Sequence, residues 1–410
     1  MRLLGGGSRE DPAAAHVRTR RRPGSSALDG KIGEMTNPAA PARPGAAHAS
    51  LTAAEGSLTA ERAVAQLLAG PPAVRAEQVA ERLLAIQGQD PRGARLAVRV
   101  RSQGLSAADV DHALTVDRSL VISWLNRGTL HLVRSADYWP LHRLTTPQLE
   151  TGCARRLAQE GIPPAAADRA AGLIERFLDR DGPLTRAQLV ERLESAGVRS
   201  QGQALVFLTF LASLRGISVR GPMIGKQHAY VLARDWLGAP PAAPDRDTAL
   251  AWLARRYLAG HTPATERDLA KWAGLPLRDV RRGLRAIAPE LDEGQDGLVR
   301  LARQPDGTAR AAGPEPALPP PRLLGVFDPL LHGWQSRATV LGPHEPQIVR
   351  GGMFGSFALA GGRAVGTWGL PGGQVSLTLL EEVSAAHRRA LETDAEDVRR
   401  FLGLAKPATR

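Results

Sequence analysis

The sequence of 410 residues has little cysteine, little lysine and few aromatic residues, and it has no long apolar run. Its one cysteine, Cys153, excludes disulfide frameworks, zinc ribbons and cysteine-bound iron–sulfur clusters, and we expect it to be a small buried apolar side chain. The ten histidines have no paired ligand spacing, so we expect neither a metal site nor a cofactor. No segment reaches the ~18 apolar residues of a membrane helix, and we expect neither a membrane span nor a secretory leader.

The charge is strongly positive. There are 53 basic and 41 acidic residues, which gives a net charge of +12, and only four of the basic residues are lysines. Such a balance favours a polyanionic partner, either nucleic acid or an anionic membrane. The abundance of Arg, Ala, Gly and Pro also reflects a GC-rich genome. With DNA as the partner, we expect a cytoplasmic, nucleoid-associated protein.

The length allows two to four compact units, since one unit takes roughly 100 to 200 residues. Composition and periodicity divide the chain as follows: a disordered extension over 1–50, with Met35 as a candidate start of translation; winged-helix units over 51–150, 151–240 and 241–302; a linker or surface loop over 303–321; and a β-rich unit with a closing helix over 322–410. The expected fold class is therefore mainly α with β wings, in an α+β arrangement.

The first unit gives the clearest pattern. The segments "LTAERAVAQLLAG" and "VRAEQVAERLLAIQ" carry apolar residues at helical spacing, and "SAADVDHAL" begins a further helix with Ser106 and Asp109 at capping-box spacing. The β-rich runs "LVISWL" and "TLHLV" follow, joined by a short turn over 126–128. Helices followed by a two-stranded hairpin are typical of a winged helix, and two further units repeat this order.

In the C-terminal segment the helical spacing of apolar residues gives way to short strand-like runs. "RLLGVFDPLL", "RATVLG", "GGMFGSFALAGG", "RAVGTWGL" and "QVSLTLLEEV" are short strand candidates separated by glycines, and they predict an antiparallel sheet or a small barrel. A helix from about Ser384 to Leu402 closes the chain.

Two glutamines in "IQGQDP" are the main candidates for chemistry. Gly88 interrupts the helical pattern and Pro91 biases Asp90 toward extended geometry, so Gln87 and Gln89 are expected to point the same way. Both amides then converge on one spot. The alternative is that they cap the end of the preceding helix, and the residues alone favour this alternative.

Several basic residues are candidates for contact with DNA. In "PLRDVRRGLRAI" Arg278, Arg282 and Arg285 share one helix face with Arg281 beside it, which resembles a recognition helix. Arg127 at the first hairpin turn, with Arg220 and Lys226 in the second wing, is similarly placed to touch phosphates. The alternatives are a solvated helix face and ordinary loop charges.

His131 and Asp90 are candidate residues of a cleft beside the glutamines. Strand alternation places His131 on the opposite face from Leu130 and Leu132. A purely structural histidine is the alternative.

Five segments resemble one known family: "IQGQDPRGARLAVRVR", "VISWLNRGTLHLV", "TPATERDLAKWAGLP", "LLGVFDPLLHGW" and "RAVGTWGL". From about Leu58 to Leu402 the chain resembles the three-tandem winged-helix proteins that include the AlkZ and YcaQ DNA glycosylases. The resemblance implies that Gln87-Gly88-Gln89 is the catalytic Gln-x-Gln of AlkZ-type members, where YcaQ-type members carry Gln-x-Asp.

The implied activity is release of N7-alkylated purines from double-stranded DNA, with bulky adducts and interstrand crosslinks included. None of the four lysines lies near the motif in sequence, so we expect a monofunctional hydrolase without an amine nucleophile. The alternatives are a non-catalytic winged-helix DNA-binding protein or transcriptional regulator, and an inert scaffold. Oligomeric state cannot be predicted from the sequence.

Overall fold

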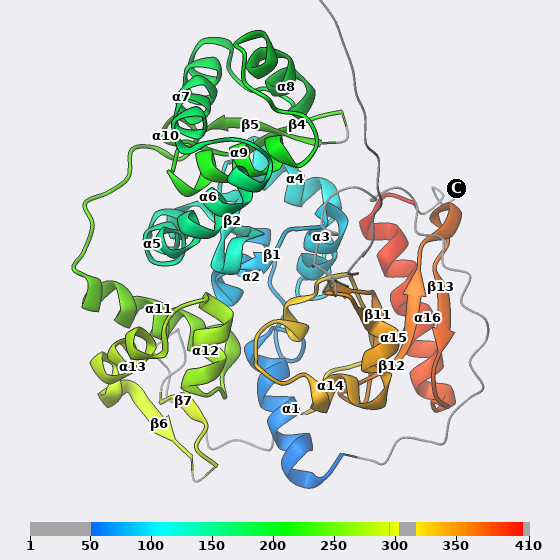
Figure 1. The fold of residues 1–410 in the computed structure, drawn as a ribbon. Coiled ribbons are helices and arrows are strands. Elements are labelled where there is room, and N and C mark those ends of the chain that lie inside the picture. The colour runs from blue at the N-terminus through cyan, green and yellow to red at the C-terminus, as the bar shows by residue number, and fades with distance from the viewer. Residues whose placement is uncertain (1–50, 226, 295, 303–316, 405–410) are drawn as a thin grey trace, which may run out of the picture. The chain divides into compact units, whose positions relative to one another are not determined.

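The computed structural model describes residues 51–225, 227–294, 296–302 and 317–404. They form helices and antiparallel sheets, which confirms the α+β class (Figure 1). The expected N-terminal extension, Lys226 and most of the expected linker lie outside the described residues. Within the described residues, no helix is both long and apolar enough to cross a membrane.

The first part of the chain contains two helices more than the pattern predicted. The elements are α1 (Ala53–Ala65), α2 (Ala76–Leu83), β1 (Ile86–Gln87), α3 (Pro91–Arg99), α4 (Ala107–Thr115), β2 (Leu120–Leu125), η1 (Asn126–Gly128), β3 (Thr129–Arg134) and α5 (Ser135–Thr145). The unpredicted helices are α3 and α5, and α3 begins where the Asp90 side chain accepts from the Gly93 amide and Pro91 fills the first position. The capping box of Ser106 and Asp109 at α4 is confirmed.

The hairpins of the first two expected units belong to one sheet. Strands β4 (Ser218–Ile224) and β5 (Gln227–Leu232) extend it, and the strand order is β1-β3-β2-β4-β5. The junction is antiparallel, with Ile122 of β2 opposite Arg220 of β4. The first hairpin is therefore an interior part of a larger sheet, and β1 with its glutamine forms one edge.

The middle of the chain is mainly helical. Its elements are α6 (Glu150–Gln159), α7 (Pro164–Asp181), α8 (Arg186–Ser195), α9 (Gln203–Leu214), α10 (Ala233–Leu237), α11 (Arg246–His261), α12 (Glu266–Ala273), α13 (Leu277–Ala286), β6 (Leu291–Glu293) and β7 (Val299–Leu301). Helices α6 to α9 and β5 enclose a separate core that includes Cys153. Burial raises the pKa of the Cys153 thiol to about 12, in agreement with the predicted apolar role.

The C-terminal segment forms an open sheet. Its elements are β8 (Arg322–Leu324), α14 (Ala338–Leu341), α15 (Glu345–Ile348), β9 (Val349–Arg350), β10 (Met353–Phe354), β11 (Phe357–Ala360), β12 (Arg363–Gly369), β13 (Ser376–Leu379) and α16 (Ala385–Phe401). Strand order β13-β12-β11-β8 leaves two edges, so the sheet alternative is correct and the barrel is not formed. The strand predicted at "RATVLG" is wrong: this segment is α14, which buries only Leu341 and so lacks the alternating burial of a strand.

The C-terminal sheet packs on the first part of the chain. A single core joins side chains of α2, β1, α3 and α4 to β8, β11, β12 and α16, among them Leu83, Ile86, Leu96, Leu323 and Phe401. The backbone of α3 lies close to the segment that follows β8, because a Cβ at Gly93 would lie 2.5 Å from the carbonyl oxygen of Val326. Segments more than 200 residues apart in sequence thus share one interior.

Two buried ion pairs reinforce this contact. The Arg101 guanidinium donates to both oxygens of Asp328 at 2.7 and 2.9 Å, and both side chains have zero exposure. Arg99 donates to Asp394 of α16 at 2.9 and 3.0 Å and to the Leu323 carbonyl at 2.7 Å. A buried charge that loses its partner is costly, so these pairs fix the position of α3 against the C-terminal sheet.

Replacement of Arg101 by methionine should therefore lower the free energy of unfolding by about 3 to 5 kcal/mol, because Asp328 would remain buried without its cation. Urea denaturation measures this change. Arg234→Ala is the matched control, since its pairs with Glu175 and Asp179 are half exposed and should contribute little to stability. Equal losses in the two variants would contradict the anchoring role of the buried pair.

Candidate active site

Gln87 is held on the edge strand of the five-stranded sheet. Helix α2 ends at Leu83, and Leu84 turns the chain with a φ of 63°. The next residues pair with β3, where Gln87 lies opposite His131. Since neighbouring residues of a strand face opposite sides, Ile86 enters the hydrophobic core and Gln87 faces the other side together with His131.

Gln89 stays beside the same strand. The Gly88 amide donates to the Leu130 carbonyl at 2.7 Å, and the Leu130 amide donates to Gln89 Oε1 at 3.3 Å. A Cβ at Gly88 would lie 3.3 Å from the Leu132 nitrogen, so glycine suits this close approach. The capping alternative is wrong for both glutamines, because α2 has already ended at Leu83 and neither amide bonds to it.

The polar end of Gln87 is available for a ligand. The residue is 8% exposed, and within the described part of the chain its amide has no hydrogen-bond partner. Gln89 forms a hydrogen bond only through its side-chain oxygen, and its NH2 group has no partner among the residues that the structure describes. An amide supplies two donors and one acceptor oxygen, so this pair has the hydrogen-bonding capacity to orient a water molecule.

Asp90 has a structural partner. Its Oδ1 accepts from the Gly93 amide at 2.5 Å, which caps α3. This bond fixes where α3 begins relative to Gln89. The side chain is half-buried.

His131 is buried at 3% exposure on the face that it shares with Gln87. Its Nδ1 lies 2.9 Å from the Thr129 carbonyl oxygen. Burial, and then the charge of Arg127, lowers the pKa of His131 to about 3. The imidazole is therefore neutral at pH 7 and supplies no proton to a substrate.

The predicted DNA-contacting residues lie in different surroundings. Arg127 is half-buried in η1 and donates to the Trp272 carbonyl of α12, and burial lowers its pKa. The Arg220 guanidinium lies over the Tyr230 ring, 4.1 Å from its centroid. Lys226 is outside the described residues.

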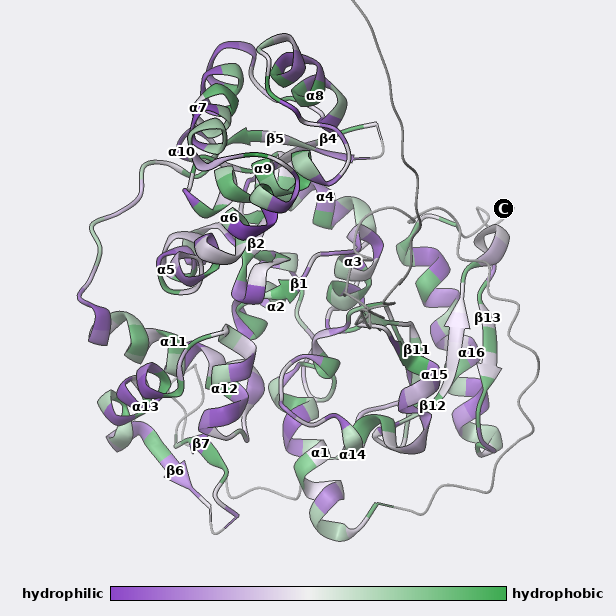
Figure 2. Ribbon diagram, in the orientation of Figure 1, coloured by the Kyte–Doolittle hydropathy of each residue, from purple (hydrophilic) through white to green (hydrophobic). Residues whose placement is uncertain are grey.

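The four arginines of α13 are all exposed, and Figure 2 shows this helix as largely hydrophilic. Arg281 pairs with Glu266 at 2.7 Å and Arg282 with Asp247 at 2.6 Å. Arg278 and Arg285 make no ion pair with any residue that the structure describes. Two of the four arginines on the predicted recognition face are therefore already paired with carboxylates of the same expected unit, 241–302.

His332 also belongs to this region, although no sequence pattern predicted a role for it. Its Nε2 is buried without a hydrogen-bond partner. Burial, followed by the charges of Arg127 and Arg337, lowers its pKa to about 3, with smaller effects of His131 and Lys271. The segment "LLHGW" belongs to the family resemblance, but local spacing contains no signal that joins residue 332 to Gln87.

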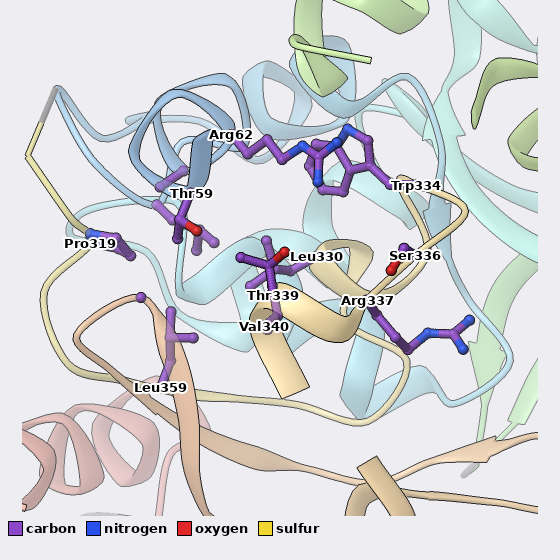
Figure 3. A pocket seen from close by; sticks show the side chains of 13 residues that line it. Thr59, Arg62, Pro319, Leu330, Trp334, Ser336, Arg337, Thr339, Val340 and Leu359 are labelled. Carbon is purple, nitrogen blue, oxygen red and sulfur yellow. The ribbon is translucent and has the colours of Figure 1, made fainter. Parts of the chain in front are cut away.

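Metal ligands are absent from the described residues, where no group of three or more His, Cys, Asp or Glu side chains could hold an ion. Figure 3 shows a small pocket whose lining residues include neither glutamine. At this pocket the Arg62 guanidinium lies 4.4 Å from the centroid of the Trp334 ring. Its lining is mostly apolar, and it supplies no candidate for chemistry on DNA.

Because these two histidines are buried, we expect the free energy of unfolding to depend on pH. In the unfolded chain a histidine titrates near about pH 6.5, whereas folded His131 and His332 titrate at about 3. Their contribution is present above about pH 6.5 and is lost as pH falls toward the folded pKa. His131→Asn should flatten the slope of unfolding free energy against pH between pH 6 and 4 by about 1.4 kcal/mol per pH unit, measured by urea denaturation.

His112→Asn removes an exposed imidazole from α4 and is the control for loss of a surface histidine. A wild-type slope in His131→Asn would mean that this imidazole is not kept neutral by folding.

Three comparisons identify relatives of this chain. A family profile described as "DNA glycosylase AlkZ-like" matches residues 80–401. A Streptomyces sahachiroi protein described as "Interstrand DNA cross-link repair glycosylase" is 28% identical over 356 residues, which cover 82% of this chain and 93% of that protein. The structure of Streptomyces sahachiroi DNA glycosylase AlkZ matches with a TM-score of 0.70 at 25% identity, over 87% of this chain and 98% of that one. The chain therefore belongs to the AlkZ-like DNA glycosylase family, and it is a monofunctional DNA glycosylase, as its resemblance predicted.

Proposed function

We propose that this glycosylase hydrolyses the N-glycosidic bond of N7-alkylated purines in double-stranded DNA, and that bulky adducts and interstrand crosslinks are among its substrates. The observation that carries the proposal is the unpartnered Gln87 amide on the edge strand β1, two residues before Gln89, whose side chain bonds to the neighbouring strand β3. The relative's description as a cross-link repair glycosylase supports the substrate class.

The chemistry suits two neutral amides. An N7-alkylated purine is cationic and leaves readily, so it needs little help from a general acid. Gln87 and Gln89 hold a water near the sugar carbon, and their carbonyl oxygens stabilise the positive charge that develops on the sugar. The carbon–oxygen bond forms as the carbon–nitrogen bond breaks, the bonding electrons neutralise the purine, and a water proton passes to solvent.

The surroundings of the glutamines fit a reaction without acid catalysis. The His131 imidazole on the same face stays neutral at pH 7, because burial lowers its pKa to about 3. The site thus favours a leaving group that already carries positive charge. An undamaged purine, which needs protonation to leave, would gain little from such a site.

We also propose that the helix groups and their paired strands act as three tandem winged helices. Their order supports this view: α11, α12 and α13 precede the β6–β7 pair, and α8 and α9 precede the β4–β5 hairpin. Exposed Arg278 and Arg285 on α13 then contact DNA phosphates. An open basic surface accommodates a bulky adduct better than an enclosed pocket for one flipped base.

Replacing either glutamine by alanine tests the catalytic role. Gln87→Ala and Gln89→Ala should each slow base release by about 10- to 1,000-fold, the range expected when oriented hydrogen bonds of ~1.4 to 4 kcal/mol are lost in the transition state. Single-turnover excision of N7-methylguanine from duplex DNA, followed by alkaline cleavage of abasic sites, measures the rate. DNA affinity should change little.

Stability separates the two variants. Gln89→Ala also removes the acceptor of the Leu130 amide and should lose about 1 kcal/mol, whereas Gln87→Ala has no such bond to lose. Gln159→Ala, which changes an exposed surface glutamine, is the matched control. If both site variants released the base at the wild-type rate, the glutamines would not be catalytic. If the wild type released none, a non-catalytic DNA-binding role would replace the proposal.

A further inference from the structure

We infer that Arg127, Lys271 and Arg337 form a clamp for one phosphodiester of the DNA backbone, beside the glutamine pair. The inference deepens the proposed function and rests on it. The three residues come from η1, α12 and the segment before α14, and no sequence pattern connects them.

Hydrogen bonds to backbone carbonyls hold the first two cations in place. Arg127 Nη1 donates to the carbonyl of Trp272, the residue after Lys271, and the Arg127 backbone packs against Gly274. Lys271 Nζ donates to the Gln335 carbonyl at 2.8 Å. Neither Arg127 nor Lys271 has a carboxylate partner among the residues that the structure covers.

Arg337 lies two residues beyond Gln335. Its Nε donates to the Leu331 carbonyl at 3.3 Å, and its guanidinium lies 5.0 Å from the centroid of the Phe354 ring. Arg337 also lines the small pocket, and Figure 3 shows its side chain extending away from Thr59 and Pro319. The same Phe354 ring meets the His332 imidazole edge-on at 4.3 Å.

The cluster carries more positive than negative charge. Its nearby carboxylates are Asp268 and Glu345. Asp268 is already occupied, since it accepts from the Thr265 and Gln335 amides at 2.8 and 2.7 Å, and Glu345 pairs with Arg337 at 3.2 Å.

The two histidines add no charge at pH 7. Burial, and then Arg127, lowers the pKa of both His131 and His332 to about 3. Burial, with Arg337 and Arg127 next, lowers the pKa of the Lys271 amine. Three cations therefore face two carboxylates, and an incoming anion would relieve the repulsion among them.

The cluster lies next to the glutamine face. Arg127 is separated from β3 by a single residue, Gly128, and it acts electrostatically on His131, the cross-strand partner of Gln87. The buried Nε2 of His332, which has no partner, lies within the influence of all three cations. Two guanidinium groups and one ammonium group, all with N–H donors, form a typical binding site for a phosphate.

A phosphate at this position has a chemical consequence. An empty cluster would repel both the cationic purine and the positive charge that develops on the sugar. A bound phosphodiester neutralises the cluster, so the clamp seats the damaged strand and removes this repulsion in one step.

DNA binding tests the clamp without any need for excision. The probe is a duplex with a tetrahydrofuran abasic-site analogue, and the variants are Lys271→Gln, Arg337→Gln and Lys271→Arg. Each glutamine variant should bind about 10-fold more weakly, and its log–log salt slope should fall by about 0.9 for the lost contact. Lys271→Arg keeps the charge and should retain the slope. Arg234→Gln, whose charge is matched by Glu175 and Asp179, is the control.

Neutral methylphosphonates then locate the phosphate. Placed one at a time around the abasic analogue, they should reveal one position at which the wild type loses about 10-fold in affinity and Lys271→Gln loses nothing further. Thermal melting verifies that each variant is folded. An unchanged salt slope in both glutamine variants, or losses that are additive at every position, would overturn the clamp.

Borohydride trapping with abasic DNA supplies a second opposing outcome. A covalent adduct on Lys271 would show its amine reacting with the sugar, and it would assign that residue a role other than phosphate binding. Failure of N7-methylguanine excision, by contrast, would overturn the proposed function and leave the binding result standing.

Discussion

The buried pairing of Arg99 and Arg101 with Asp394 and Asp328 is the interaction on which the candidate site depends. These pairs fix α3 against the C-terminal sheet, and α3 begins at Asp90, directly after the glutamines. The Gln87–Gly88–Gln89 segment is thereby held from two sides, by β3 through main-chain bonds and by α3 through its cap. In the proposed reaction the amides must be oriented before the substrate arrives, so rigidity imposed from outside the motif serves the proposed chemistry.

Local signals in the sequence predicted much of the fold. The hairpin around 126–128, the capping box at Ser106 and the closing helix are confirmed, because each depends on neighbouring residues. Helix α3 was not predicted, because the residue before a proline favours extended geometry, but Asp90 and Pro91 are themselves the start of a helix. The strand at "RATVLG" was wrong, since tertiary packing overrides β propensity in so short a segment.

The candidate site was predictable only in part. The facing of Gln87 follows from strand geometry, because it pairs with His131 on β3. Gln89 lies two residues further on, beyond the end of β1, so the shared direction of the two amides stays a prediction. The surroundings of Arg127, Lys271, His332 and Arg337 arise from contacts across as many as 145 residues, and no local sequence pattern records such contacts. Exposure on α13 was correctly expected, but the pairing of Arg281 with Glu266 and Arg282 with Asp247 depends on the arrangement of neighbouring helices.

The position of Asp394 in α16 has a consequence for synthesis of the protein. Asp394 follows Arg99 by 295 residues, so the buried guanidinium lacks this carboxylate until residue 394 has left the ribosome. The core under β1 also includes Phe401, so the glutamines reach their final support only after that residue has been synthesised. A chain truncated before Asp394 would contain the complete motif and lack the support that holds it.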